Sequence, residues 1–433
     1  MRDLGRSDDP RVQAQLDRLA ALSLPQGRFG LDTMQSLLAR LGDPHESLPP
    51  VFHVAGTNGK GSTCAFLRAM LEAGGYRVHA TISPHLVRYN ERIRLAGRLI
   101  EDAHLAELLA EVLDASEGLN PSFFEATIAA AFLAFSREPA DACVVEVGLG
   151  GRLDATNVIR EPAVCGIAAL GMDHERFLLA AEEGTPTNPM ARIAYEKAGI
   201  AKQGAPLVTF AYGAAENEAV AAVARQAGAQ WLAQGRDWDV RGLADGLFYS
   251  DGLGTGSKDL HLPLPSLAGT HQIANAGLAI AMLRHQRALP ITVETLAAGL
   301  QAARWPARLQ KLGPGLLMGE RDIWLDGGHN PSAGEALATH FAGRRVHLVV
   351  GMIEGKDPAG FLAPLRSSLA SMTVVPVPGH EWHDATAFGP MAQPADDVPS
   401  ALAVLPDDGL PVLITGSLYL AGEVLRLNGE VPD

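Results

Sequence analysis

The sequence is poor in charged residues, in aromatic residues and in cysteine. Only 19% of its 433 residues are Asp, Glu, Lys or Arg, and only 6% are Phe, Trp or Tyr. The formal net charge is −14, so the chain has no overall basic field that would favour nucleic acid as a partner. Its three cysteines, Cys64, Cys143 and Cys165, stand far apart in apolar runs. This spacing predicts buried thiols and argues against disulfides and a zinc site.

Long hydrophobic runs are also missing. The longest, such as 126–135 and 276–283, are far shorter than the roughly 18 residues that a membrane-spanning helix needs. The first residues are charged and lack the apolar core of a signal peptide. We therefore expect a cytoplasmic protein with no membrane partner. Hydrophobic residues still make up 47% of the chain, which is enough to build packed cores and excludes a wholly disordered protein.

Short apolar runs alternate with helical patterns along the first two thirds of the chain. Buried strands are predicted at 51–54, 78–82, 143–147, 164–170 and 207–210. Helices are predicted between them at 62–72, 101–113, 125–135 and 191–202. We expect residues 231–262 to form a small antiparallel excursion, followed by a helix over 271–286. The alternation predicts βαβ units and a mostly parallel sheet.

A second alternating series follows Trp305 and Pro306. Its strands are predicted at 322–325, 346–350, 372–375 and 412–414, with helices after Pro331, Pro358 and Ser417. The predicted fold class is therefore α/β, with a P-loop parallel-sheet domain over 1–300 and a smaller Rossmann-like α/β domain over 301–433.

A glycine-rich loop between a predicted strand and a predicted helix is the sharpest single motif. Residues 51–63 read VFHVAGTNGKGST, in which the glycines allow backbone N–H groups to converge on phosphate oxygens. Lys60 would reach the β- and γ-phosphates of a nucleoside triphosphate. The common spelling GxxxxGK[ST] is not met, because Val54 takes the place of the first glycine and Gly61 follows the lysine. The alternative is a plain glycine turn with a solvated lysine.

The spelling GTNGKGS resembles the ATP loop of the Mur ligase superfamily, and most closely that of folylpolyglutamate synthase/dihydrofolate synthase. Further motifs of that family follow in order along most of the chain. They are Ser83-Pro-His-Leu, Asn90-Glu-Arg-Ile, Glu146-Val-Gly-Leu-Gly-Gly-Arg-Leu-Asp-Ala-Thr-Asn157, Asp173-His174, Glu196-Lys197, His271-Gln-Ile-Ala-Asn275, Trp305-Pro-Ala-Arg308, Asp326-Gly-Gly-His329-Asn-Pro and Thr415-Gly-Ser417. One glycine loop is a weak signal, whereas this ordered set is strong.

The resemblance implies ATP and one or two Mg²⁺ ions. For ATP it implies a contact set of Thr57, Asn58, Gly59, Lys60, Gly61, Ser62, Asn275, Arg308 and Asp326. For Mg²⁺ it implies Ser83, Glu146 and His174, a hydroxyl, a carboxylate and an imidazole that suit a site completed by phosphate oxygens and water. From the residues alone, the alternatives are a satisfied core carboxylate at Glu146 and a structural histidine at His174.

Lys197 would be read from the sequence alone as part of a solvated charge cluster with Glu196 and Lys202. The resemblance instead implies that its amine is carbamylated by CO₂ and helps to position Mg²⁺. It further implies that His329 and Ser417 lie near the incoming glutamate, with a catalytic role for His329 and a substrate contact for Ser417. For the pteroate it implies contacts with Phe29, Ser122, Phe123, Phe124, Glu125, Leu153, Asp154 and Ala155.

One segment departs from the family pattern. Twenty-two residues separate His174 from Lys197, and the usual Leu-Gly turn after Phe177 is missing. An insertion therefore lies next to the expected metal site.

The predicted function is an ATP-dependent acid–amino-acid ligase of folate biosynthesis and one-carbon metabolism, acting as a monomer. It would join L-glutamate to dihydropteroate, and add further glutamates to tetrahydrofolate, through an acyl phosphate. Two alternatives are a Mur-type peptidoglycan-precursor ligase and a nucleotide-switch protein, although no Asn-Lys-x-Asp guanine motif follows the loop. Hydride transfer is disfavoured because Leu153 interrupts the GxGxxG pattern that begins at Gly148.

Overall fold

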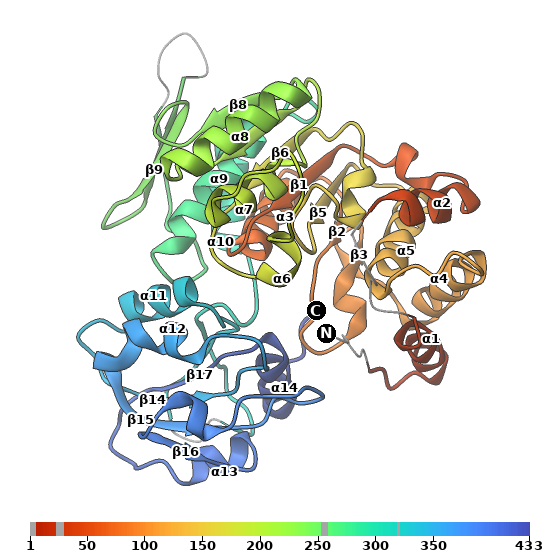
Figure 1. Ribbon diagram of the computed structural model, residues 1–433. Coiled ribbons are helices and arrows are strands. Elements are labelled where there is room, and N and C mark those ends of the chain that lie inside the picture. The colour runs from red at the N-terminus through yellow and green to blue at the C-terminus, as the bar shows by residue number, and fades with distance from the viewer. Residues whose placement is uncertain (1–5, 23–29, 253–258, 318–320) are drawn as a thin grey trace. The chain divides into compact units, whose positions relative to one another are not determined.

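Two compact units make up the chain, of which the computed structural model describes residues 6–22, 30–252, 259–317 and 321–433 (Figure 1). The first unit comprises Met1–Pro84, Arg88–Ser266 and Gln272–Arg304, and the second comprises His85–Val87, Leu267–His271 and Trp305–Asp433. Each unit contains a mostly parallel sheet flanked by helices, so the predicted α/β class is confirmed.

The first unit is built on an eight-stranded sheet with the order β4-β3-β2-β5-β1-β6-β7-β8. Its strands are β1 Val51–Ala55, β2 Val78–Thr81, β3 Ile93–Leu95, β4 Arg98–Leu99, β5 Ala142–Glu146, β6 Val164–Ile167, β7 Pro206–Thr209 and β8 Gln230–Ala233. Every pair from β2 to β8 in this order is parallel, whereas β3 and β4 pair antiparallel at one edge. The central strands are buried along their whole length, which explains their continuous apolar sequences.

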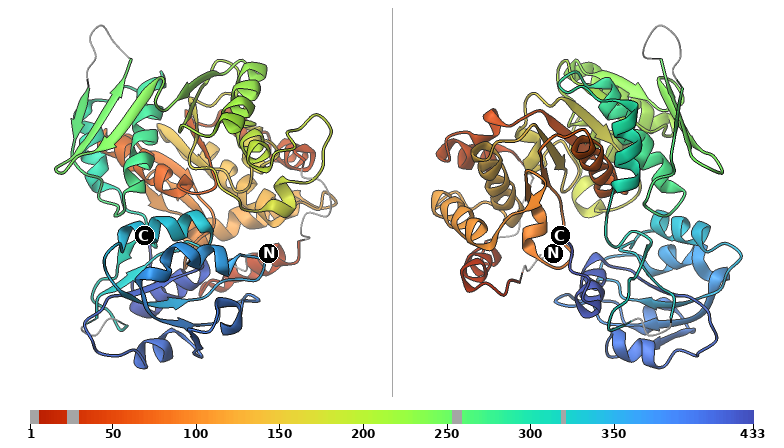
Figure 2. Two further views of the ribbon diagram at one scale, coloured as in Figure 1. Left: turned by 60° about the vertical axis from the view of Figure 1, so that its left-hand side comes forward. Right: turned by 180° about the vertical axis from the view of Figure 1, so that it is seen from behind.

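Helices cover both faces of this sheet, as Figure 2 shows. They are α1 Pro10–Ala20, α2 Asp32–Arg40, α3 Lys60–Ala73, α4 Asp102–Ala115, α5 Phe123–Arg137, α6 Glu175–Leu178, α7 Pro189–Ala198, α8 Ala214–Ala227, α9 His271–His285 and α10 Val293–Ala302. Cys143 and Val145 of β5 pack with α5, and Cys165 of β6 packs with α7 and α8. On the opposite face Gly166 lies against Met282 of α9, where a Cβ would come within 2.3 Å of the sulfur.

The carboxyl ends of β5, β1 and β6 lie side by side in the middle of the sheet. The glycine-rich loop follows β1, Glu146 ends β5, and the segment that leads to Asp173 and His174 follows β6. Ligand sites in open α/β sheets form where neighbouring strands send their connections in different directions. The topology therefore brings three of the sequence motifs to one edge.

The predicted antiparallel excursion starts later than expected. Residues 230–233 form β8, which extends the main sheet parallel to β7, and Trp231 donates its indole N–H to Thr209 Oγ1 at 3.0 Å. The separate antiparallel sheet consists of β9 Trp238–Gly242, β10 Leu247–Asp251 and β11 Leu260–Leu262. Two other boundaries were also wrong: β6 ends at Ile167, and α7 ends at Ala198 because Gly199 caps it.

The second unit contains a six-stranded sheet with the order β12-β13-β17-β14-β15-β16. Its strands are β12 Gln310–Lys311, β13 Ile323–Leu325, β14 Val346–Val350, β15 Leu369–Val374, β16 Ala392–Pro394 and β17 Val412–Thr415. Its helices are α11 Pro331–His340, α12 Pro358–Leu362, α13 Val398–Ala403 and α14 Leu418–Asn428. Among the described strands of this sheet, β12 alone runs antiparallel to its neighbour. The edge strands β12 and β16 were not predicted, because two or three half-exposed residues carry no periodic signal.

All three cysteines are buried free thiols, so the predicted burial is confirmed. Burial raises the pKa of each thiol, so none is a ready nucleophile. Within the described part of the chain, no helix combines the length and the apolar character needed to cross a membrane.

Candidate active site

The glycine-rich loop has the predicted strand–loop–helix setting, with β1 ending at Ala55 and α3 beginning at Lys60. Gly59 lies in the left-handed region with φ +85°, and a Cβ there would come within 2.4 Å of Asn275 Oδ1. Both facts require glycine at this position. The first N–H groups of an α-helix lack acceptors within the helix, so the start of α3 offers donors to an anion.

The segment after β6 holds the loop in place. Thr57 N and Asn58 N donate to the carbonyl of Ala169 at 2.7 and 3.2 Å. The Thr57 hydroxyl donates to Gly171 O at 3.0 Å and accepts from Gly171 N at 3.1 Å. These four hydrogen bonds hold the loop against the segment that follows β6.

Helix α9 also contacts the phosphate loop and the start of α3. Gln272 donates from Nε2 to the Ser62 hydroxyl at 3.3 Å, and Asn275 donates from Nδ2 to Gln272 Oε1 at 3.0 Å. Ser62, Gln272 and Asn275 are all buried. Gln272 and Asn275 thus lie against the phosphate loop although more than 200 residues separate them from it in sequence.

Two lysines meet on one carbonyl oxygen of the loop. Lys60 Nζ donates to Gly56 O at 3.1 Å and to Thr57 O at 3.3 Å, and Lys197 Nζ donates to the same Gly56 O at 3.0 Å. Lys197 is only 4% exposed, so the interpretation of this residue as part of a solvated cluster is wrong. Burial, reinforced by the neighbouring positive charge of Lys60, lowers its pKa to about 7.

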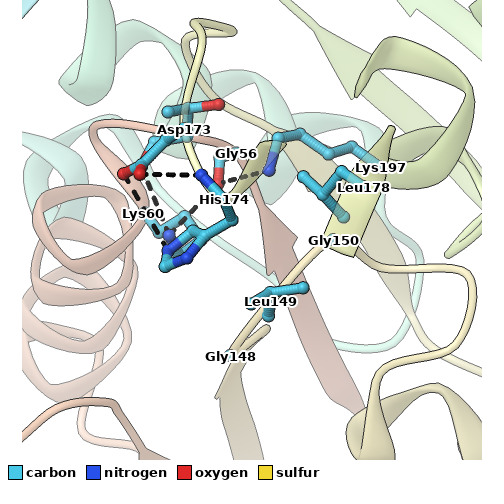
Figure 3. A pocket seen from close by; sticks show the side chains of 10 residues that line it. Gly56, Lys60, Gly148, Leu149, Gly150, Asp173, His174, Leu178 and Lys197 are labelled. Atoms are coloured by element: carbon cyan, nitrogen blue, oxygen red, sulfur yellow. Dashed lines mark hydrogen bonds and ion pairs between the residues drawn. The ribbon is translucent and has the colours of Figure 1, made fainter. Parts of the chain in front are cut away.

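A small cavity of about 20 Å³ opens beside these lysines, enough for a single water molecule. Figure 3 shows Lys60, Asp173 and His174 grouped on one side of the cavity, with Lys197 reaching in from another. The residues that line it are Gly56, Thr57, Lys60, Gly148, Leu149, Gly150, Asp173, His174, Leu178 and Lys197. Asp173 was missing from the predicted site residues, although it stands next to His174 in a quoted motif. Its Oδ1 accepts from His174 N at 2.8 Å.

Two of the three residues expected to bind metal contact each other. Ser83 N donates to Glu146 Oε2 at 3.3 Å, and the Glu146 side chain is buried at the end of β5. His174 lies at the cavity with Asp173, and its side chain is 37% exposed. The described residues contain no cluster of three His, Cys, Asp or Glu side chains that could hold a metal ion unaided.

The segment expected to contact a pteroate begins α5. Ser122 and Glu125 form a reciprocal cap, in which Ser122 N donates to Glu125 Oε2 at 2.8 Å and Glu125 N donates to Ser122 Oγ at 3.2 Å. Phe123 packs edge-on against Tyr89 with ring centroids 6.0 Å apart. The Phe124 ring lies against Gly148, where a Cβ would come within 2.3 Å of the ring.

Asp154 is buried and fixes the loop after β5. Its carboxylate accepts hydrogen bonds from Leu149 N at 2.8 Å and from the backbone and hydroxyl of Thr156 at 3.0 and 2.5 Å. Burial raises its pKa. Leu153 is half-buried and Ala155 is buried on either side of it. Phe29, the remaining residue expected to contact the pteroate, lies outside the described residues.

The second unit places Arg308 and Asp326 close together in its own fold. The Asp326 carboxylate accepts from Leu309 N at 2.9 Å and from Gly328 N at 2.7 Å, so it joins two of the sequence motifs. Arg308 Nη1 donates to Ala307 O at 2.9 Å. A Cβ at Gly327 would come within 3.0 Å of the Arg308 guanidinium.

His329 and Ser417 lie at the carboxyl ends of β13 and β17, which pair in parallel. His329 Nδ1 is 3.1 Å from Gly327 O, and the buried Ser417 caps α14 by accepting from Tyr419 N at 3.1 Å. The carbonyl of Gly328 accepts from the backbone N–H of residue 416 at 3.0 Å, which ties the two loops to each other.

Comparison with known proteins gives full-length similarities. The chain is 33% identical to the dihydrofolate synthase/folylpolyglutamate synthase of Bacillus subtilis over 92% of this chain and 94% of that protein. It resembles the structure of Escherichia coli FolC in complex with DHPP and ADP, with a TM-score of 0.84, 31% identity and coverage of 96% and 97% of the two chains. A bifunctional folylpolyglutamate synthase/dihydrofolate synthase with Mn, AMPPNP and L-glutamate bound has a TM-score of 0.82, 30% identity and coverage of 98% and 99%. No protein-family model matches.

Proposed function

Because this chain belongs to the dihydrofolate synthase/folylpolyglutamate synthase family, we propose that it ligates L-glutamate to dihydropteroate and to tetrahydrofolate at the expense of ATP. The family resemblance found in the sequence is thereby confirmed. The observation that carries the proposal is the meeting of Lys60 and the buried Lys197 on one carbonyl of a phosphate loop. A simple glycine turn would not place a second lysine amine, shielded from solvent, beside it.

We assign ATP and pteroate binding to residues 1–300 and glutamate binding to residues 301–433. Support for the first assignment comes from the phosphate loop, Asn275 and the Phe124 ring, all in the first unit. Arg308, Asp326, His329 and Ser417 lie in the second unit. There Arg308 is proposed to contact phosphate, Asp326 the ribose, and His329 and Ser417 the incoming glutamate. The enzyme is proposed to act as a cytoplasmic monomer.

Lys60 and the N–H groups at the start of α3 would stabilise negative charge as the γ-phosphoryl group moves to the acceptor carboxylate. The glutamate amine then attacks the acyl phosphate, so that an amide bond forms and phosphate leaves. His329, near the amine, would orient it for this attack.

The donor set suits Mg²⁺, which binds through one or two carboxylates together with phosphate oxygens and water. Glu146, the Ser83 hydroxyl and His174 would hold it, with a carbamate on Lys197 as a further anionic group. The ion would supply positive charge to the phosphates. Since the described residues form no cage of three metal-binding side chains, we expect binding to depend on the nucleotide.

Product analysis tests the proposed function directly. The protein is incubated with ATP, Mg²⁺ and L-glutamate, with dihydropteroate and tetrahydrofolate as competing acceptors, and the products are identified by mass. We expect dihydrofolate and glutamate-extended tetrahydrofolate, with phosphate released only when an acceptor and glutamate are both present. Steady ATP hydrolysis without either would favour the nucleotide-switch alternative. Extension of tetrahydrofolate alone would remove the dihydrofolate synthase activity from the proposal.

A substitution at Gly148 tests the assignment of Phe124 to the pteroate site. In Gly148→Ala the new Cβ would lie within 2.8 Å of three atoms of the Phe124 ring, which must therefore move. We expect KM for dihydropteroate to rise about 2- to 10-fold, because the free energy of one aromatic stacking contact corresponds to a change of that size. KM for glutamate should stay constant. Gly242→Ala is the control, because its Cβ would meet Ile273 at an ordinary 3.6 Å. An unchanged KM for dihydropteroate in Gly148→Ala would contradict the assignment.

A further inference from the structure

Residues 179–188 connect α6 to α7, the helices that carry Leu178 and Lys197 to the cavity. This is the segment in which the sequence departs from the family pattern. One of its side chains, Glu182, forms ion pairs with two arginines. Its carboxylate accepts from Arg152 Nη1 and Nη2 at 3.2 and 2.6 Å, and from Arg192 Nη2 at 3.2 Å. The connection is therefore anchored at its fourth residue.

The same two arginines hold Glu196, the neighbour of Lys197. Arg152 donates from Nε and Nη2 to the Glu196 carboxylate at 3.1 and 3.0 Å, and Arg192 donates from Nε at 3.0 Å. Arg152 N also donates to the Glu196 carbonyl at 2.7 Å. The side chains of Arg192 and Glu196 are only 7% and 6% exposed. Charges in such surroundings interact more strongly than those of a solvated pair.

Glu182 completes the charge balance of this group of four side chains. With Glu182 present, two guanidinium groups face two carboxylates. Without its charge, Arg152 and Arg192 would share the single carboxylate of Glu196, and a half-buried positive charge would be left uncompensated. Arg192 also donates to the Thr185 hydroxyl, so the anchor extends along the connection.

The anchored connection adjoins the walls of the cavity. At its start, Leu178 lines the cavity and packs at Gly150, where a Cβ would come within 3.0 Å of Leu178 Cδ2. His174 is the residue immediately before the same short helix and has a left-handed backbone, φ +54°. At its end, Asn188 caps α7, the helix that carries Lys197.

We infer that Glu182 is a positioning residue for ligation: through Arg152 and Arg192 it fixes the distance between the α6 wall, with His174 and Leu178, and the Lys197 amine. This inference rests on the proposed function. A group held out of position by about 1 Å can lower the rate of a reaction by up to roughly 100-fold. The effect of Glu182 should therefore appear in kcat and in the Mg²⁺ requirement, and not in the affinity for glutamate.

The adjacent Glu183 offers a matched control, because it is exposed and lies in the same connection. Glu182→Gln and Glu183→Gln remove the same charge from neighbouring positions. We expect Glu182→Gln to lower kcat about 10-fold or more and to raise the Mg²⁺ concentration needed for half-maximal activity, with KM for glutamate unchanged. Glu183→Gln should match the wild type in all three. Glu182→Asp, which keeps the carboxylate, should recover part of kcat.

Trypsin tests the anchor without any activity measurement. Arg176 is the last tryptic site before Arg192, and it lies in α6, three residues before the connection begins. Cleavage after Arg176 should be faster in Glu182→Gln than in Glu183→Gln. Equal cleavage in both variants would overturn the anchor, and wild-type kcat and Mg²⁺ dependence in Glu182→Gln would overturn the positioning role. A wild-type protein that forms no product would instead refute the proposed function, a result separate from the trypsin comparison.

Discussion

Lys197→Ala should abolish ligation while the protein stays folded. The amine of Lys197 is fully buried, has a pKa of about 7 and lies 3.0 Å from Gly56 O at the phosphate loop. Only an unprotonated amine reacts with CO₂, forming a carbamate and releasing a proton. The burial that lowers the pKa therefore favours the modification that the family resemblance implies. Turnover is measured with dihydropteroate, ATP and glutamate, and the fold is checked by thermal unfolding.

Lys197→Arg distinguishes a carbamate from a needed positive charge. Arginine remains cationic and cannot be carbamylated, so this variant should be as inactive as Lys197→Ala. Added formate or acetate should restore some activity to Lys197→Ala by supplying carboxylate oxygens in the vacated space. Wild-type activity in Lys197→Arg would refute the carbamate.

The pKa of Lys197 also fixes how the modification depends on pH. Above pH 7 the amine is largely neutral and can accept CO₂, and below pH 7 it is largely protonated and cannot. A carbamate signal from ¹³C-labelled bicarbonate should therefore be present in the NMR spectrum at pH 8 and weaken as the pH falls through 7. The Lys197→Ala protein is the blank for this experiment.

Lys60→Ala should lower kcat about 10²- to 10³-fold, the usual effect of removing one group that stabilises charge in the transition state. Among the described residues, Lys60 donates to the carbonyls of Gly56 and Thr57, so its loss should have little effect on stability. Single-turnover kinetics with ATP and dihydropteroate measure the phosphoryl-transfer step itself.

A control for Lys60→Ala removes a lysine elsewhere in the chain. Lys311 pairs with Asp322 at 2.7 Å, and its side chain is 58% exposed. Lys311→Ala should keep the wild-type kcat, because a solvated pair of this kind contributes little. Near-normal turnover in a folded Lys60→Ala protein would remove Lys60 from the phosphate site.

The sequence alone determined the strands and helices that carry the site. The runs at 51–54 and 143–147 are continuously apolar, as expected for strands buried on both faces, and the structure has strands at Val51–Ala55 and Ala142–Glu146. The glycine loop before Lys60 is likewise local, because its shape depends on backbone freedom at a few adjacent residues. Ordered motifs such as these were also sufficient to identify the family.

Tertiary structure alone decided the surroundings of each functional side chain. Lys197, next to Glu196 on a predicted helix, reads as solvated. It is nevertheless buried, at a cavity lined by the loops after β1, β5 and β6 and by Leu178 of α6. Asn275 meets Gly59, and Arg152 meets Glu182, through contacts between residues far apart in sequence. Hydrophobic periodicity reports which face of an element is buried, but it does not say which distant partner covers that face. The pKa of Lys197 and the anchoring of the 179–188 connection depend on those partners, and so they could be found only in the folded chain.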